Sequence, residues 1–168
     1  KCENKLKIFT PDTRVVDAAL ALVGEKMNFK IACEQVLDGI LFEDENVKVS
    51  AVHNSHLKET GDNGWHSFSY LIEAEGKRVI FSGDVLEPKE LDAFCSAPID
   101  LLIMETGHHA VADVCDYAKS RGVKALRFNH HGREILEDRA TAEKYVSDFA
   151  NSHGMDIALC KKDGSVVR

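Results

Sequence analysis

The chain has 168 residues, 28 of them acidic and 21 basic, which gives a net charge of −7 with histidine neutral. This length fits a single domain, and 44% hydrophobic residues exclude a disordered chain. The excess of acidic residues excludes general nucleic-acid binding through a basic surface. A phosphorylated substrate remains possible, because a bound metal ion makes the local electrostatic potential positive.

No apolar run approaches the roughly 18 residues that a membrane span needs. Five cysteines are scattered without a C-x-x-C motif, which is typical of reduced thiols in a cytoplasmic protein. We therefore expect a cytoplasmic protein. The sequence begins with Lys1 rather than Met, and we expect it to be a fragment.

The first third of the chain predicts a strand, a helix and a hairpin. A short apolar run at residues 6–9 ends in a turn, and apolar residues then recur at helical spacing over 13–27. Residues 29–36 alternate as a strand. Asp38-Gly39 indicates a hairpin turn into a partner strand at 40–42.

The middle third predicts a strand at 47–52, followed by a polar loop at 57–66 that is long enough to overhang a site. Residues 67–73 and 78–82 then form the strongest hairpin in the chain, which ends at Gly83-Asp84.

The last part predicts a short helix at 88–95, a buried strand at 100–104 and a helix from Ala110. A strand at 123–128 and a final helix follow, with closing strands at 155–160 and 165–167 around the Asp163-Gly164 turn. Hairpins followed by strand–helix–strand units predict an α/β fold, a mixed sheet with helices packed against it.

The helices that start near Thr13, Ala110 and Thr141 are expected to cover one face of the sheet. The opposite apolar face then needs a cover, either an amino-terminal segment or a neighbouring chain, because such a face does not persist in water.

Side chains that bind metals follow four predicted strands, where ligands collect in sheets of this type. They are His53, His56, Asp84, Glu105, His108, His109, His130 and His131. Imidazole and carboxylate donors suit zinc, manganese or iron rather than calcium. Because neighbouring side chains in an extended chain diverge, we expect His109 and His131 not to be ligands.

At these residues the sequence resembles the metallo-β-lactamase-fold hydrolases, in the branch that contains ribonuclease Z and phosphodiesterase-like relatives. The resemblance rests on VKVSAVHNSH, HSFSYLIEAEGKRVIFSGDV, IDLLIMETGHH and VKALRFNHHGREI and covers nearly the whole chain. It implies part of an αββα sandwich. It also implies that His56, Asp84 and His130 are metal ligands, with His53 the rival of His56, and that Asp84 bridges two metals.

The same resemblance matches Glu105 to an acidic residue that ends a strand and places His108 at the site rim, where we expect it to protonate the leaving group. The parent protein would be a hydrolase, with zinc, manganese or iron as cofactor. Its substrate would be a small-molecule or nucleotide phosphoric ester, with nucleic acid left open as a less favoured alternative. Water activated between two metals would carry out the reaction.

Two departures from the family matter. The H-x-H-x-D-H segment, which lies upstream of Lys1 in the family, does not occur in this chain. Ribonuclease Z has a glutamate where this chain has Phe81, and its H-S-T segment is absent here. We therefore expect residues 1–168 to be the carboxyl-terminal two-thirds of the domain, inactive alone, and we do not expect tRNA processing.

Two other functions remain open. One is a non-catalytic α/β binding or interaction module derived from the same fold, which the upstream gene sequence would distinguish from an enzyme. The other is a response-regulator-like domain with Asp84 as phosphate acceptor. The hairpin that leads into Asp84 counts against the second, because that fold alternates strand and helix.

Overall fold

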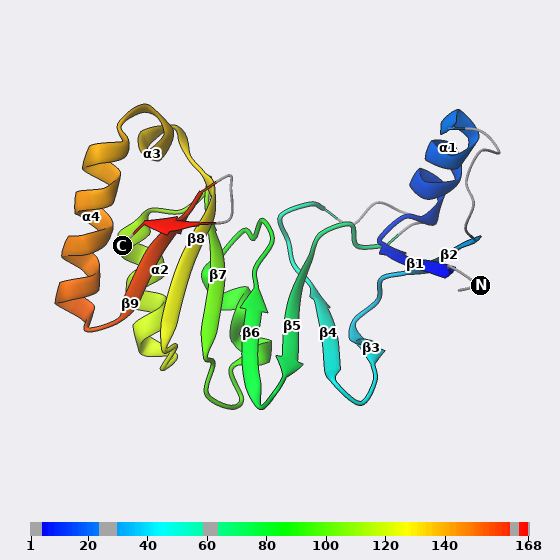
Figure 1. Cartoon of the computed structure of the whole chain (residues 1–168), viewed down its shortest axis with the longest axis horizontal. Helices are drawn as coiled ribbons and strands as arrows, with labels where there is room; N and C mark the ends of the chain where they lie inside the picture. The colour runs from blue at the N-terminus through cyan, green and yellow to red at the C-terminus, as the bar shows by residue number, and fades with distance from the viewer. Residues whose placement is uncertain (1–4, 24–29, 59–63, 162–164, 168) are drawn as a thin grey trace.

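The computed structural model describes residues 5–23, 30–58, 64–161 and 165–167. Its main feature is a mixed sheet of eight strands in the order β10-β9-β8-β7-β6-β5-β4-β3, and a second sheet pairs β1 with β2 (Figure 1). The eight strands are β3 (Gly39–Glu43), β4 (Val47–His53), β5 (Phe68–Ala74), β6 (Lys77–Phe81), β7 (Leu101–Thr106), β8 (Ala125–His131), β9 (Asp156–Cys160) and β10 (Val166–Val167).

The pairing of neighbouring strands changes from antiparallel to parallel at β6. Strands β3 to β6 are antiparallel hairpin partners, whereas β6, β7, β8 and β9 run parallel. This matches the predicted α/β arrangement, in which hairpins precede strand–helix–strand units. Because parallel strands end at the same edge, the loops that follow β6, β7 and β8 converge there.

One face of the eight-stranded sheet is covered by helices. These are η2 (Pro88–Phe94), α2 (Val111–Ser120) and α4 (Arg139–His153). Their apolar side chains share one core with the inward residues of β5 to β9, among them Leu102, Leu126 and Ile157. A further short helix, α3 (Arg133–Glu137), was not predicted and lies between β8 and α4.

The opposite face of the sheet carries apolar side chains without a helix over them. Alternation along the strands places Ile72, Val79, Leu101 and Ile103 on this face, and all four are half-buried. Phe81, on the same face, is 37% exposed. The described residues therefore cover one face of the sheet fully and the other in part.

The amino-terminal elements form a separate unit at the end of the molecule opposite α4 (Figure 1). β1 (Lys5–Thr10) and β2 (Lys30–Gln35) are parallel and α1 (Thr13–Val23) joins them. A small core of Val36, Ala51 and Phe68 connects this unit to the main sheet, because Val36 follows β2 whereas Ala51 and Phe68 belong to β4 and β5.

Two predictions for this region were wrong. The predicted hairpin around Asp38-Gly39 does not form, since β2 pairs with β1 and β3 pairs with β4. A helix between two strands is a crossover that makes the strands parallel, and this outweighs the local turn signal. The helix from Thr13 does not cover the main sheet either, because α1 packs beside β2 and buries no residue.

Several expected features lie outside the described residues, namely the end of the first helix at Met27, part of the overhanging loop and the Asp163-Gly164 turn. Within the described part of the chain, no helix is both long and apolar enough to cross a membrane.

Candidate metal centre

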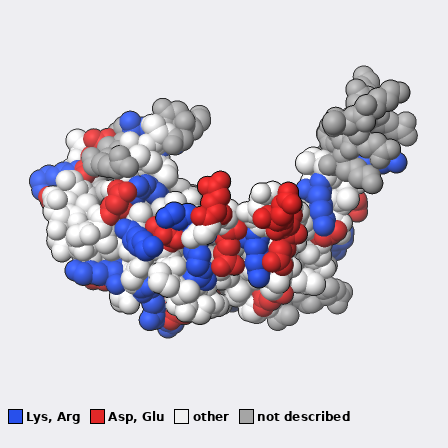
Figure 2. Space-filling view, turned by 60° about the horizontal axis from the view of Figure 1, so that its bottom comes forward, with Lys and Arg blue, Asp and Glu red and all other residues white. Residues whose placement is uncertain are grey.

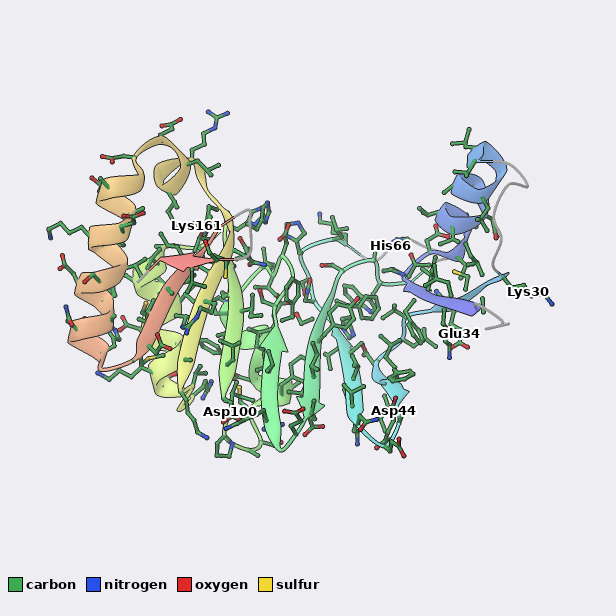
Figure 3. The ribbon with its side chains drawn as sticks, in the orientation of Figure 1. Lys30, Glu34, Asp44, His66, Asp100 and Lys161 are labelled. Carbon is green, nitrogen blue, oxygen red and sulfur yellow. The ribbon has the colours of Figure 1, made fainter. Side chains whose placement is uncertain are left out.

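Four side chains with metal-binding atoms converge at the edge of the sheet where β6, β7 and β8 end. They are Asp84, Glu105, His108 and His130, and one donor atom from each lies within 4.8 Å of the others. In Figure 3, His66 and Lys161 lie toward this edge, whereas Asp44 and Asp100 mark the opposite edge. The opposite edge is a mixed surface of acidic and basic side chains (Figure 2).

Asp84 owes its position to the turn after β6. Gly83 has φ of 59°, and a Cβ atom there would lie 2.9 Å from the carbonyl oxygen of Phe68. Only glycine combines this left-handed backbone with so close a contact at no steric cost. The chain thus leaves β6 abruptly, and the Asp84 carboxylate lies at the sheet edge.

His130 is turned into the site by an irregularity in β8. The pairing of β7 with β8 shifts register after Glu105, which is opposite Asn129, so that Thr106 is opposite His131. His130 is therefore the extra residue of β8, without a partner in β7, as at a β-bulge. Its φ is 43°. Its Nδ1 atom then lies 2.7 Å from Oδ1 of Asp84.

His131 points away from this cluster, as the divergence of neighbours requires. Its Nε2 donates to the carbonyl oxygen of Cys160 at 3.0 Å, and its Nδ1 lies 3.1 Å from Oγ1 of Thr106. Both ring nitrogens of His131 are therefore engaged in tying β8 to its neighbours.

Glu105 is the buried acid of the site, with its side chain 1% exposed. It accepts hydrogen bonds from the backbone N–H of His108 at 2.9 Å and lies 2.9 Å from Nδ1 of the same histidine. Nε2 of His109 lies 3.4 Å from Glu105 and donates to the carbonyl oxygen of Val85 at 2.9 Å. Glu105 thus fixes the loop that carries His108.

His56 lies beside the same cluster. Its Nε2 is 3.9 Å from Oδ2 of Asp84, and its ring contacts that of His108 edge-on with centroids 4.8 Å apart. The buried Asn54 positions this turn, since its Oδ1 accepts from the His56 backbone N–H and its Nδ2 donates to Ser69.

His53, the rival of His56, makes different contacts. Its Nδ1 lies 2.6 Å from Oδ2 of Asp38, and its ring stacks on Trp65 with centroids 4.3 Å apart. The structure therefore brings His56, Asp84 and His130 together with Glu105 and His108, and engages His53 elsewhere.

Glu90 supports the site and was missed by sequence reasoning. Its carboxylate accepts from the backbone N–H groups of Ser55 at 2.8 Å and Leu86 at 2.9 Å, so it joins the turn before His56 to the loop after Asp84. Burial would raise the pKa of Glu90, but the hydrogen bonds from Ser55, Glu87 and Leu86 outweigh it and lower the pKa. A glutamate in a short helix gives no sequence signal for this role.

The donor set fits a divalent transition metal. Imidazole nitrogens and carboxylate oxygens bind zinc at about 2.0–2.2 Å in three- to four-residue sites, and donors within 4.8 Å need only small rotations to reach one ion. The present hydrogen bonds, Asp84 to His130 and Glu105 to His108, hold these donors close together.

A cleft of about 720 Å³ adjoins the cluster. It shares His108 with the site and lies between the loop after β7, the start of α3 and one side of α4. It is lined by Thr106, Gly107, His108, His109, Ala110, Val111, Gly132, Arg133, Ile135, Thr141, Ala142 and Tyr145.

No protein-family model and no curated protein matches the sequence, but solved structures match its fold. The metallo-β-lactamase fold protein YhfI from Bacillus subtilis superposes with a TM-score of 0.65 at 14% identity, over 97% of this chain and 65% of that one. Igni18, a metallo hydrolase from the archaeon Ignicoccus hospitalis, superposes with a TM-score of 0.62 at 15% identity, over 96% of this chain and 67% of that one.

The short form of human tRNase Z gives a TM-score of 0.63 at 18% identity, over 79% of this chain and 62% of that one. The fold of this chain is therefore the metallo-β-lactamase fold, and the chain spans about two thirds of the length of these three structures.

Proposed function

We propose that this chain supplies the carboxyl-terminal metal-binding part of a metal-dependent hydrolase that cleaves phosphoric esters. The observation that carries this proposal is the convergence of Asp84, Glu105, His108 and His130 within 4.8 Å. The structural neighbours support this proposal, since Igni18 is a metallo hydrolase and another neighbour is human tRNase Z.

The proposed ligands are His56, Asp84 and His130, with Glu105 and His108 at the same centre. A bound divalent ion would lower the pKa of water toward 7 and polarise a phosphoryl oxygen. Zinc is the metal we propose, with manganese or iron as the other candidates for an imidazole and carboxylate set. Asp84 presents one oxygen to His130 and the other to His56, an orientation that suits a bridge between two ions.

His108 is the proposed proton donor to the leaving oxygen. Its side chain is 44% exposed at the rim of the cleft, and Nδ1 is held by the buried Glu105. With Nδ1 engaged by this carboxylate, Nε2 is the ring nitrogen that we propose delivers the proton.

We further propose that residues 1–168 are the carboxyl-terminal two-thirds of the domain, and that additional residues cover the open face around Phe81. The apolar side chains on this face and the coverage of 62–67% of the neighbouring structures support this proposal. Those residues would complete the ligand set of a two-metal centre.

The test is hydrolysis of bis(p-nitrophenyl) phosphate by the protein that contains this chain at its natural length. We expect turnover that chelation abolishes, zinc or manganese restores, and Asp84→Asn removes. Chelator-resistant turnover, or full activity in Asp84→Asn, would refute the proposal.

A non-catalytic interaction module is the second candidate, which the open apolar face favours because such faces commonly bind other chains. It predicts tight binding of a partner protein with no metal-dependent turnover. The same assay therefore separates the two candidates.

A further inference from the structure

The cleft beside the metal centre has a largely apolar wall that includes an aromatic ring. Most of its wall is apolar, formed by Val111 and Ile135 with Ala142 and Tyr145 of α4. The Tyr145 ring is held edge-on against Phe149, with centroids 4.6 Å apart, and the residue remains 44% exposed. A ring face held in this way offers a stacking surface to a planar group.

Arg133 provides the only guanidinium in this lining. It makes no hydrogen bond or ion pair within the described part of the chain, in contrast to Arg14, Arg78, Arg121 and Arg127. An available guanidinium favours an anionic ligand, because its planar fork matches phosphate oxygens.

The size and charge of the surroundings limit what this ligand can be. A volume of about 720 Å³ lies in the range of small-molecule sites. A polynucleotide would instead need a track of basic residues along its backbone, and the chain carries a net charge of −7.

We propose that this cleft binds the organic group of a nucleotide-sized phosphoric ester, with an aromatic ring stacked on Tyr145 and the phosphate between Arg133 and the His108 edge of the metal centre. This inference rests on the proposed function and narrows its substrate class to small ring-containing esters.

The experiment compares adenosine 5′-monophosphate with inorganic phosphate, by isothermal titration into the zinc-loaded chain. We expect the nucleotide to bind at least tenfold more tightly than phosphate. Tyr145→Ala should remove this preference, while phosphate affinity stays within twofold. Tyr145→Phe should retain the preference because it keeps the ring.

The matched control is Lys144→Ala, next to Tyr145 on α4 and paired with Asp148, which should leave both affinities unchanged. Circular dichroism establishes that each variant is folded. Equal binding of nucleotide and phosphate to the wild type, or a full preference in Tyr145→Ala, would overturn the inference.

Metal titration of the same samples separates this inference from the proposed function. If zinc binds and the nucleotide preference is absent, the cleft assignment alone is wrong. If zinc binds neither this chain nor the protein at its natural length, and the preference still depends on Tyr145, the cleft assignment stands and the proposed hydrolase is wrong.

Discussion

The carboxylate of Asp84 and the imidazole of His130 come from positions 46 residues apart and lie 2.7 Å from each other. Asp84 follows β6 and His130 is the last residue but one of β8, with β7 between these two strands in the sheet. Their contact depends on two unusual backbone conformations, the positive φ angles of Gly83 and His130. The geometry of the site is therefore built into the ends of the strands.

The Gly83 turn provides the first prediction. Gly83→Ala should destabilise the fold by about 2 kcal/mol or more, because a left-handed alanine costs about 1 kcal/mol and its Cβ would meet the Phe68 carbonyl oxygen at 2.9 Å. Gly76→Ala is the control, with φ of 70° but open space around the new Cβ. Urea denaturation should show Gly83→Ala to be the less stable variant. Equal stabilities would show that the close contact relaxes freely.

Glu90 provides the second prediction. Glu90→Ala should lower stability by about 1–3 kcal/mol, because three backbone N–H groups lose a charged acceptor. It should also weaken metal binding, since the turn before His56 and the loop after Asp84 lose their common anchor. Denaturation and metal titration measure the two effects.

Glu45→Ala is the matched control for Glu90, because Glu45 is an exposed acid in a turn, and it should change stability by less than about 0.5 kcal/mol. A Glu90→Ala variant with wild-type metal affinity would show that Glu90 does not position the site.

Much of the fold could be predicted because apolar periodicity and turn residues identify most of the strands. The hairpin of β5 and β6 and the apolar strand before Glu105 were both found in this way. The convergence of Asp84 with His130 followed from the rule that parallel strands end at one edge. The roles of His56, Asp84, His108 and His130 stay predictions.

The features that could not be predicted depend on contacts between residues that are distant in the sequence. The parallel pairing of β1 with β2 overrode the turn signal at Asp38-Gly39. The register shift that turns His130 inward depends on the pairing of two strands and has no sequence signature of its own. Glu90 acts through backbone groups whose proximity only the folded chain defines.

Asp100 provides the third prediction, on pH. A hydrogen bond from Lys124, followed by one from the backbone N–H of Arg78, lowers the pKa of Asp100 to about 2 from 3.8. Since the folded pKa is below the unfolded value, Asp100 stabilises the fold above about pH 4, and this stabilisation is lost as the pH falls toward 2. Unfolding should show a smaller loss between pH 4 and pH 2 in Asp100→Asn than in the wild type. Identical pH profiles would contradict the assignment.

The open sheet face provides the fourth prediction. Phe81→Ser should reduce self-association and the binding of a hydrophobic dye, because it removes an exposed apolar ring from this face. Light scattering and dye fluorescence measure both, with the helix residue Leu22→Ser as control, since Leu22 is exposed outside the face. If Leu22→Ser reduces dye binding and Phe81→Ser does not, the sheet face is not the surface that binds the dye.

The most direct test of the metal centre is the visible absorption spectrum of the chain titrated with Co²⁺. We expect a d–d band that saturates near one ion per chain, because the described donors converge on one point. Asp84→Asn and His130→Gln should abolish the band, while His153→Gln, whose ring is bonded to Asp116, should retain it. A band of full intensity in both Asp84→Asn and His130→Gln would show that the metal binds elsewhere and would contradict the proposed centre.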